Sequence, residues 1–515
     1  MRKQLHIIPL VFAAALALLN GCELETKLLY TEQIGKATIE SFFSELDGLI
    51  AAGEGLHKEM RSFIDGDYLR YGDIRGDLLN STVDANEGDL LALNYELTAE
   101  HVATYPRNIW AGGWAVVTEA NNIIYYGGKL RDSGRYTMDS ELATIDRVIA
   151  QAYFGRAFAH FCLCNCYAWP YNYTADHSHL GIPVMDHVPG FNDKVDRKSV
   201  KVVYKQIFDD IAESRRLFRS SAAKDPAAAV TFCQIDAITD CYHISDIACE
   251  ALLARIYLYM GDWENAETCS KNVMDKVPLT TYEGYVKMFR NSQDYPGPEA
   301  ILRMNSYNAT TSMASFYDPP RSPKFIPNPD LYSLIDDYDL RKSLLTYVPL
   351  TTEDIYQPGL TIKGVCKYSY DRTITDPYKK VSDCFVFRCS EMYLIHAEAA
   401  LRGRGDTSAA NDDIKALEGR ALNLPIDSFV LMWSTPDELL ELIMTERKTE
   451  LCFEGHRFFD MLRNGENLSR PASSNAKLKS LAYPDYRFIL PIDRMECQYN
   501  EYIQQNEGYD DYKKK

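Results

Sequence analysis

Apolar residues follow the helical period in several parts of the chain. Phe42, Leu46 and Ile50 recur every four residues and predict a helix over about 38–60 that is buried through this face. Residues 71–77 are rich in Gly and Asp and predict a turn. The same period predicts three further helices: from near Ile109 to a stop at Gly127-Gly128, over about 140–168, and over 203–218.

Two segments have the pattern of a helical hairpin closed by Gly-Asp. An apolar helix ends at Gly261-Asp262, and the next helix places Ala266 against it. The same spacing returns where Gly405-Asp406 precedes Ala410. This is the plan of a tetratricopeptide-like unit, whose period is about 34 residues. We therefore predict a mainly α fold in which such hairpins form an α-solenoid scaffold. Unrelated hairpins in an irregular bundle are the alternative.

Three loop-rich insertions, near 80–108, 169–198 and 281–385, interrupt the helical pattern. Irregular segments on a rigid frame are where binding sites usually lie. The candidate ligand contacts are aromatic residues in or beside these insertions: Tyr95, Tyr105, Trp169, Phe316 and Tyr317. Ordinary loop packing is the alternative for each of them. Trp110 and Trp263 fall on predicted helices and are expected in the core.

The N-terminus has the pattern of a lipoprotein export signal. Arg2 and Lys3 precede an apolar run over 7–19, which is shorter than the roughly 20 residues that span a bilayer. Gly21-Cys22 follows directly, so the Cys22 thiol is the predicted lipid attachment site. We divide the chain into a signal peptide, 1–21, and one helical binding domain, 22–515. An ordinary secretory signal that contains a cysteine is the alternative.

Composition excludes several classes of function. The formal net charge is −18, which argues against a nucleic-acid-binding surface. The 13 cysteines form no Cys-x-x-Cys pair, and Cys162, Cys164 and Cys166 are expected to be buried structural thiols. No metal site and no cofactor are predicted. The sequence lacks the serine-hydrolase elbow, the His-Glu-x-x-His helix and the P-loop, so we expect no enzyme.

An acidic block near the C-terminus has a structural, a catalytic and a partner-contact interpretation. Glu446, Glu450 and Glu454 lie four residues apart, and Arg447 and Arg457 flank them. Paired carboxylates are typical of glycoside hydrolysis, which needs none of the motifs above. Carboxylates interleaved with arginines more often form a structural ion-pair lattice, and we favour that interpretation.

Three ordered motifs in the C-terminal third resemble a known family. They are Arg388-x-x-Glu391 followed by Ala397-Glu398-Ala399, the block from Glu446-Arg447 to Arg463, and Pro491-Ile492 followed by Gln505-Asn506 and Gly508-Tyr509. Together with the export signal, they resemble the SusD/RagB family of outer-membrane nutrient-binding lipoproteins of Bacteroidota. Asp493 and Glu507 stand where that family more often has proline, so these turns are expected to differ locally.

The resemblance implies a binding protein anchored by lipid in the outer membrane and facing the extracellular side. Such a protein captures a nutrient, most often an oligosaccharide and less often a peptide. It delivers the nutrient to a SusC-like TonB-dependent transporter. The alternatives are an exported carboxylate-dependent glycan hydrolase, a peptide-binding member of the same family, and a scaffold or adhesin.

Overall fold

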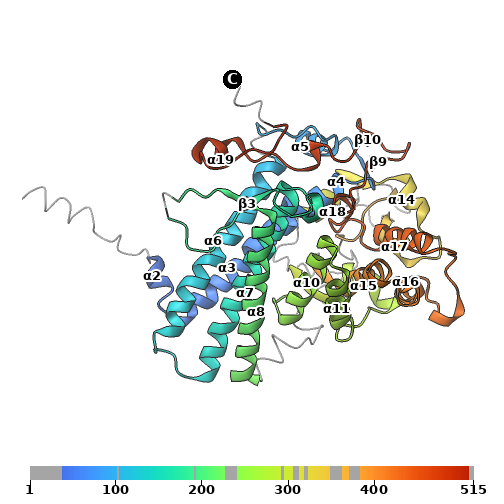
Figure 1. Cartoon of the computed structure of the whole chain (residues 1–515). Helices are drawn as coiled ribbons and strands as arrows, with labels where there is room; N and C mark the ends of the chain where they lie inside the picture. Colours follow the sequence, from blue (N-terminus) through green and yellow to red (C-terminus); the bar gives the residue numbers. More distant parts are fainter. Residues whose placement is uncertain are drawn as a thin grey trace, which may run out of the picture.

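Four long helices lie side by side in the N-terminal half of the computed structural model (Figure 1). They are α3 (Leu46–Phe63), α6 (Tyr105–Asp132), α7 (Asp139–Tyr167) and α8 (Val200–Lys224). The structure describes residues 38–100, 104–190, 193–226, 241–290, 295–304, 312–317, 323–347, 362–369 and 383–509. Cys22 and the predicted signal peptide lie outside these residues.

Helix α8 shows how sequence determines this bundle. Its N-cap Ser199 accepts a hydrogen bond from the backbone N–H of Val202, as helix starts favour. Val203, Ile207 and three further apolar residues at helical spacing are buried against α7. The predicted helices over 140–168 and 203–218 are therefore confirmed.

The two predicted hairpins are present and stack on each other. The first is α10 (Asp246–Met260) with α11 (Trp263–Met274), and the second is α15 (Cys389–Arg404) with α16 (Thr407–Leu422). Gly261 and Gly405 have φ of +70° and +68°, in the left-handed region that glycine adopts without strain. Asp262 and Asp406 then cap the returning helices. Helix α11 packs on α15, and α17 (Pro436–Glu450) covers the second hairpin. The mainly α fold with tetratricopeptide-like hairpins is confirmed.

The prediction of which face of the first helix is buried is wrong. Phe42 and Ile50 are 40% and 39% exposed, and α3 instead buries Leu49, Leu56 and Met60. These residues face α6 and α7, so the buried face of α3 lies on its other side. A short helix, α2 (Ile39–Phe42), precedes α3.

Glycines misled two other predictions. The first part of the predicted turn over 71–77 belongs to helix α4 (Leu69–Ile74), and the chain turns only at 75–78. A Cβ on Gly72 would lie 2.1 Å from the carbonyl oxygen of Gly455. Helix α6 continues past Gly127 to Asp132. Gly127 does not end the helix but lets Ile149 and Leu49 approach it closely. These glycines serve close packing and do not end helices.

Short elements lie in the insertions and in other parts of the chain, above all the C-terminal part. Five two-stranded antiparallel sheets are described: β1 (Leu79–Ser81) with β5 (Phe325–Pro327), β2 (Leu180–Pro183) with β3 (Arg197–Ser199), β4 (Ala300–Met304) with β8 (Cys384–Arg388), β6 (Thr346–Tyr347) with β7 (Ile362–Lys363), and β9 (Leu468–Ser469) with β10 (Ser480–Leu481). The short helices are α5 (Glu87–Leu93), α12 (Tyr282–Arg290), α13 (Ser312–Tyr317), α14 (Pro329–Leu334), α18 (Arg457–Arg463) and α19 (Arg494–Tyr499), with 3₁₀ turns at Tyr171–Tyr173, Leu340–Leu345, Ile426–Ser428 and Tyr486–Phe488 and a π turn at Ile64–Tyr68.

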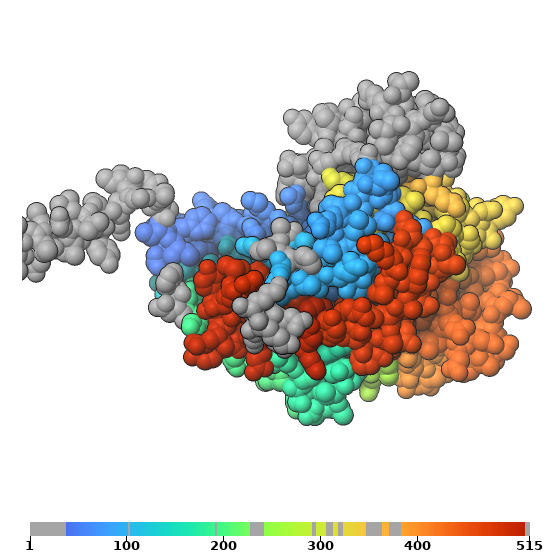
Figure 2. Space-filling view, turned by 90° about the horizontal axis from the view of Figure 1, so that it is seen from above, coloured from blue at the N-terminus to red at the C-terminus, as the bar shows by residue number. Residues whose placement is uncertain are grey.

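The C-terminal segment covers one end of the helical frame. Figure 2 shows it in red, beside the light-blue chain that leads into α6. Gln505 fixes the segment by bonding both the N–H and the carbonyl oxygen of Ile492, at 2.8 and 2.7 Å. Asn506 donates to the carbonyl oxygens of Tyr167 and Leu490, at 2.8 and 2.7 Å. The Gln-Asn motif of the sequence thus attaches this segment to the end of α7.

Cys162, Cys164 and Cys166 are buried free thiols on α7, as predicted. No disulfide joins any of the cysteines in the described ranges. Within those ranges, no helix combines the length and the apolar character that crossing a bilayer requires.

Candidate functional site

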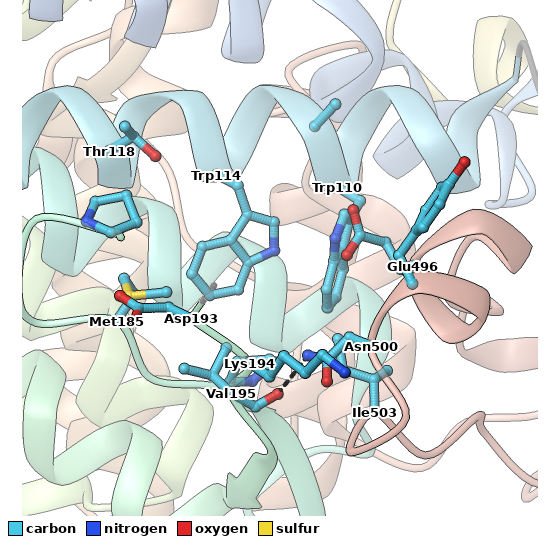
Figure 3. A pocket seen from close by; sticks show the side chains of 14 residues that line it. Trp110, Trp114, Thr118, Met185, Asp193, Lys194, Val195, Glu496, Asn500 and Ile503 are labelled. Carbon is cyan, nitrogen blue, oxygen red and sulfur yellow. Dashed lines mark hydrogen bonds between the residues drawn. The ribbon is translucent and has the colours of Figure 1, made fainter. Parts of the chain in front are cut away.

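A hollow of about 410 Å³ lies between α6, residues 183–189 and 193–195, and residues 496–503 of the C-terminal segment (Figure 3). Fourteen residues line it: Trp110, Ala111, Trp114, Thr118, Pro183, Met185, Pro189, Asp193, Lys194, Val195, Glu496, Tyr499, Asn500 and Ile503. Three segments distant in sequence therefore meet at one site.

Two tryptophans form one wall of the hollow. Trp110 and Trp114 are one turn apart on α6, and their ring centroids are 5.6 Å apart at an interplanar angle of 63°. Trp110 is 4% exposed and packs edge-on against Tyr167, with centroids 4.9 Å apart. Trp114 is partly exposed, and no described residue accepts a hydrogen bond from its indole N–H. Trp114 therefore offers the hollow an apolar ring surface, while its indole N–H is buried.

Polar groups form the opposite rim. Asn500 donates from Nδ2 to the carbonyl oxygen of Val195 at 2.8 Å, which joins the C-terminal segment to the chain after β2. Lys194 Nζ lies 3.1 Å from a carboxylate oxygen of Glu501. Tyr499 is 75% exposed at the edge. The rim thus combines amide, carboxylate, ammonium and phenol groups around an aromatic wall.

Glu496 is the partly buried carboxyl group of the hollow. Burial raises its pKa, the nearby Asp493 raises it further, and a hydrogen bond with the Trp110 side chain partly offsets both effects. The N-cap Asp493 positions Glu496, because its side chain accepts from the N–H of Met495 at 3.2 Å and so starts α19. Asp493 replaces the proline that the resembling family more often has here, and it creates a capped helical turn.

Four of the five predicted ligand contacts are buried. Tyr95, Tyr105, Phe316 and Tyr317 are at most 3% exposed and pack in the core. Tyr105 and Tyr317 also donate their phenol hydrogens to buried carboxylates. Of these four residues, Tyr95 lines a hollow, which is described below, and none of the four lines the α6 hollow.

Trp169 is the partly exposed member of the predicted set. Its ring stacks on Tyr173, with centroids 4.7 Å apart and planes 10° apart. Tyr173 is 41% exposed and covers one side of the indole. Trp169 does not line the α6 hollow. Its role as a ligand contact stays a prediction.

Other hollows are present among the described residues. One, of about 270 Å³, is lined by Tyr95, Tyr486 and Tyr509 among others. Another, of about 960 Å³, lies between the two hairpins, where Trp263 forms part of the wall. In this larger hollow, Glu267 is paired with Arg404 and with His396. The α6 hollow is the better candidate because it combines two tryptophans with Glu496, a carboxylate without an ion-pair partner among the described residues.

Comparisons with known proteins match most of the chain. A model of the SusD family matches residues 357–509, and a model described as starch-binding associating with outer membrane matches residues 71–258. A SusD-like protein of Formosa agariphila is 22% identical, over 90% of this chain and 93% of its own length. The chain belongs to the SusD-like family.

Solved structures of this family share the fold of our SusD-like protein. A SusD superfamily protein from Bacteroides thetaiotaomicron has a TM-score of 0.73 at 22% identity, covering 90% of this chain and 99% of that chain. A SusD-like carbohydrate-binding protein from Bacteroides vulgatus has a TM-score of 0.66 at 19% identity, covering 88% and 97%. The resemblance drawn from the motifs is therefore confirmed.

The acidic block of this SusD-like protein is an ion-pair lattice. Arg388 contacts Glu454 at 2.8 Å, Glu450 at 2.5 Å and Glu299 at 3.0 Å. Arg341 contacts Glu446 and Glu450, at 2.5 and 3.1 Å. The three acids of the predicted block therefore each have a cationic partner, and none of them lines the α6 hollow.

Burial alone would raise the pKa of Glu450 and of Glu454. At Glu450 the guanidinium groups of Arg420 and Arg388 outweigh the effect of burial and hold the pKa well below the ordinary value. At Glu454, Arg388 and Lys367 lower the pKa to about 2. Both acids are thus held as anions in the lattice, which suits a structural role and not proton donation.

Proposed function

We propose that this SusD-like protein is a lipid-anchored binding protein of the outer membrane that captures an oligosaccharide in the α6 hollow. It then hands the ligand to a SusC-like TonB-dependent transporter. The family supports the class of function, because one matching model is described as starch-binding and associating with the outer membrane. The related Bacteroides vulgatus structure is named a carbohydrate-binding protein.

The observation that carries the proposal is the tryptophan pair in a polar-rimmed hollow (Figure 3). Sugar rings have apolar C–H patches that pack on aromatic faces, and hydroxyl groups that need hydrogen-bond partners. Trp114 supplies a partly exposed aromatic surface. Asp193 and Asn500 supply polar atoms at the opposite rim. The volume of about 410 Å³ is within the usual range for small-ligand pockets.

A calorimetric titration with maltooligosaccharides and a panel of other glycans tests ligand capture. Trp114→Ala should weaken binding of the best ligand at least tenfold, because it removes the aromatic wall. Trp114→Phe keeps a smaller aromatic surface and should lose less affinity. Tyr338→Ala is the matched control, since that ring is 86% exposed and does not line the hollow.

Unchanged affinity in Trp114→Ala, with the thermal stability of the wild type, would rule out this hollow as the binding site. Glycan chains recovered after incubation should be intact, because we propose capture without hydrolysis. Shortened chains would favour the hydrolase alternative. A peptide that binds where no glycan does would favour a peptide-binding family member.

The anchor and the transporter need separate tests. Residues 1–21 would act as the signal peptide, and the Cys22 thiol would carry the lipid. Radiolabelled palmitate should label the protein, and Cys22→Ser should abolish the label. Purification from detergent-solubilised outer membranes should recover a TonB-dependent transporter with the protein. Recovery of the protein without such a partner would contradict the delivery step.

A further inference from the structure

The carboxylate of Glu496 faces the α6 hollow without an ion-pair partner among the described residues. Its described partner is the Trp110 side chain, and Figure 3 shows the two groups side by side. The lattice acids differ, because each of Glu446, Glu450 and Glu454 contacts a guanidinium or ammonium group. Partly buried carboxylates are costly unless they are paired or protonated. Glu496 therefore lies where a cation would be stabilised.

The neighbouring charges do not supply that cation. Asp493, only 5% exposed, adds a second negative charge, and Arg107 lies 3.7 Å from it with a side chain that is 51% exposed. Lys194 is engaged by Glu501 at 3.1 Å.

On the far rim, Asp193 is held by its own segment. Its carboxylate accepts from the backbone N–H of Gly190 at 2.6 Å and lies 3.3 Å from the His187 ring. Among the described residues, the lining of the hollow therefore carries two carboxylates, Asp193 and Glu496, against one ammonium group that another acid already binds.

The tryptophans favour the same kind of ligand. An ammonium group is attracted to the face of an indole ring within about 6 Å of its centroid, and desolvation strengthens the attraction. Trp114 contributes a partly exposed ring to the hollow, and Trp110, 4% exposed, lies next to it and bonds Glu496. A carboxylate next to aromatic faces is a suitable environment for a protonated amine, whereas a neutral sugar would leave the Glu496 charge uncompensated.

We propose that the α6 hollow prefers a glycan that carries a protonated amine, such as a glucosamine unit, with Glu496 as its counter-ion and the Trp110 and Trp114 rings beside it. This inference rests on the proposed glycan-binding function and specifies the chemical class of its ligand. Neutral glycans would still bind through the aromatic wall, but more weakly.

The test compares two trisaccharides that differ in charge, one of glucosamine and one of N-acetylglucosamine, with maltotriose as a neutral reference. Calorimetry at mildly acidic pH and physiological salt should show that the glucosamine trisaccharide binds about tenfold more tightly than its N-acetylated counterpart. Glu496→Gln should reduce this preference to about twofold or less without weakening the binding of the N-acetylated sugar.

Glu507→Gln is the matched control. It removes the same charge from the same segment, and Glu507 is exposed and does not line the hollow. It should keep the tenfold preference, which separates a local counter-ion from general attraction to an acidic protein. Equal affinity for the two trisaccharides, or a preference that survives in Glu496→Gln, would overturn the inference. If only neutral glycans bind, the inference fails while glycan capture stands; if no glycan binds, the proposed function itself fails.

Discussion

Replacing Arg388 by methionine tests whether the buried lattice stabilises the fold. Arg388 is 1% exposed and lies at the junction of β8 and α15. Its guanidinium group donates to Glu299, Glu450 and Glu454, and also to the carbonyl oxygen of Glu450 at 2.7 Å. Methionine has similar length and apolar character, so the substitution removes the charge and its donors with little change in packing.

The expected loss of stability depends on the ion pairs that remain after Arg388 is replaced. Without Arg388, Arg420 still contacts Glu299 and Glu450, at 2.9 and 2.8 Å, and Lys367 still contacts Glu454 at 2.6 Å. Each carboxylate keeps at least one cationic partner, and Glu450 also keeps Arg341, but each loses a charged partner in a buried site. Breaking a buried ion pair on one side typically costs about 3–5 kcal/mol of unfolding free energy. Since whole domains are stable by only about 5–15 kcal/mol, this would be a large fraction of the total.

Urea unfolding followed by circular dichroism and tryptophan fluorescence measures the effect, and coincident transitions justify a two-state fit. Arg388→Lys keeps the charge but not the forked donor geometry, so its loss should be smaller than that of methionine. Arg404→Met is the control at the other end of α15, because Arg404 is exposed and its pairing with Glu267 is open to solvent. It should leave the unfolding midpoint nearly unchanged. Equal shifts in Arg388→Met and Arg404→Met would refute the argument that burial makes the lattice important.

Three further predictions concern stability. Gly261→Ala should cost about 1–2 kcal/mol, measured by urea unfolding, because φ is +70° there and alanine is strained in that region. Thr435→Ala should cost about 1 kcal/mol, because Thr435 and Glu438 form a capping box at the start of α17. Acid should destabilise the protein, since cations hold the pKa of Glu450 well below normal and that of Glu454 at about 2. The stability that these two acids contribute is fully present above the ordinary glutamate pKa of about 4.3, and it is lost as pH falls through their lower pKa values in the folded protein. Urea midpoints that stay constant through this acidic range would contradict the prediction.

Local signals in the sequence predicted the hairpins well. The Gly-Asp pairs at Gly261-Asp262 and Gly405-Asp406 determine both the left-handed turn and the following N-cap, so sequence and geometry correspond directly. Predictions failed where glycine serves tertiary packing. Gly72 was predicted to lie in a turn and Gly127 to end a helix, but each of them lets a distant part of the chain approach a helix. Such contacts depend on residues far away in sequence, and local patterns do not reveal them.

The sequence predicted that the acidic block forms ion pairs, but it did not reveal all the residues of the lattice. The spacing of the glutamates indicated ion pairing with arginines, and the structure confirms it. Glu299, Arg420 and Lys367 complete the lattice from other elements, and no spacing rule connects them to it.

The binding site was harder to predict. Aromatic residues in insertions were expected to face the ligand, yet Tyr95 and Tyr317 fill the core beneath those insertions. Trp110 was correctly expected in the core, but its neighbour Trp114 opens onto a hollow. That hollow exists because the C-terminal segment folds back onto α6. The Gln505-Asn506 motif that fixes this segment was visible in the sequence, but its target on α7 was not.

The position of a bound glycan in a crystal of the complex tests the central claim most directly. The account predicts electron density for a sugar ring against Trp114 in the α6 hollow, within hydrogen-bonding distance of Glu496 or Asn500. Density at another surface, such as the hollow beside Tyr486 or the one between the two hairpins, with the α6 hollow empty, would contradict it.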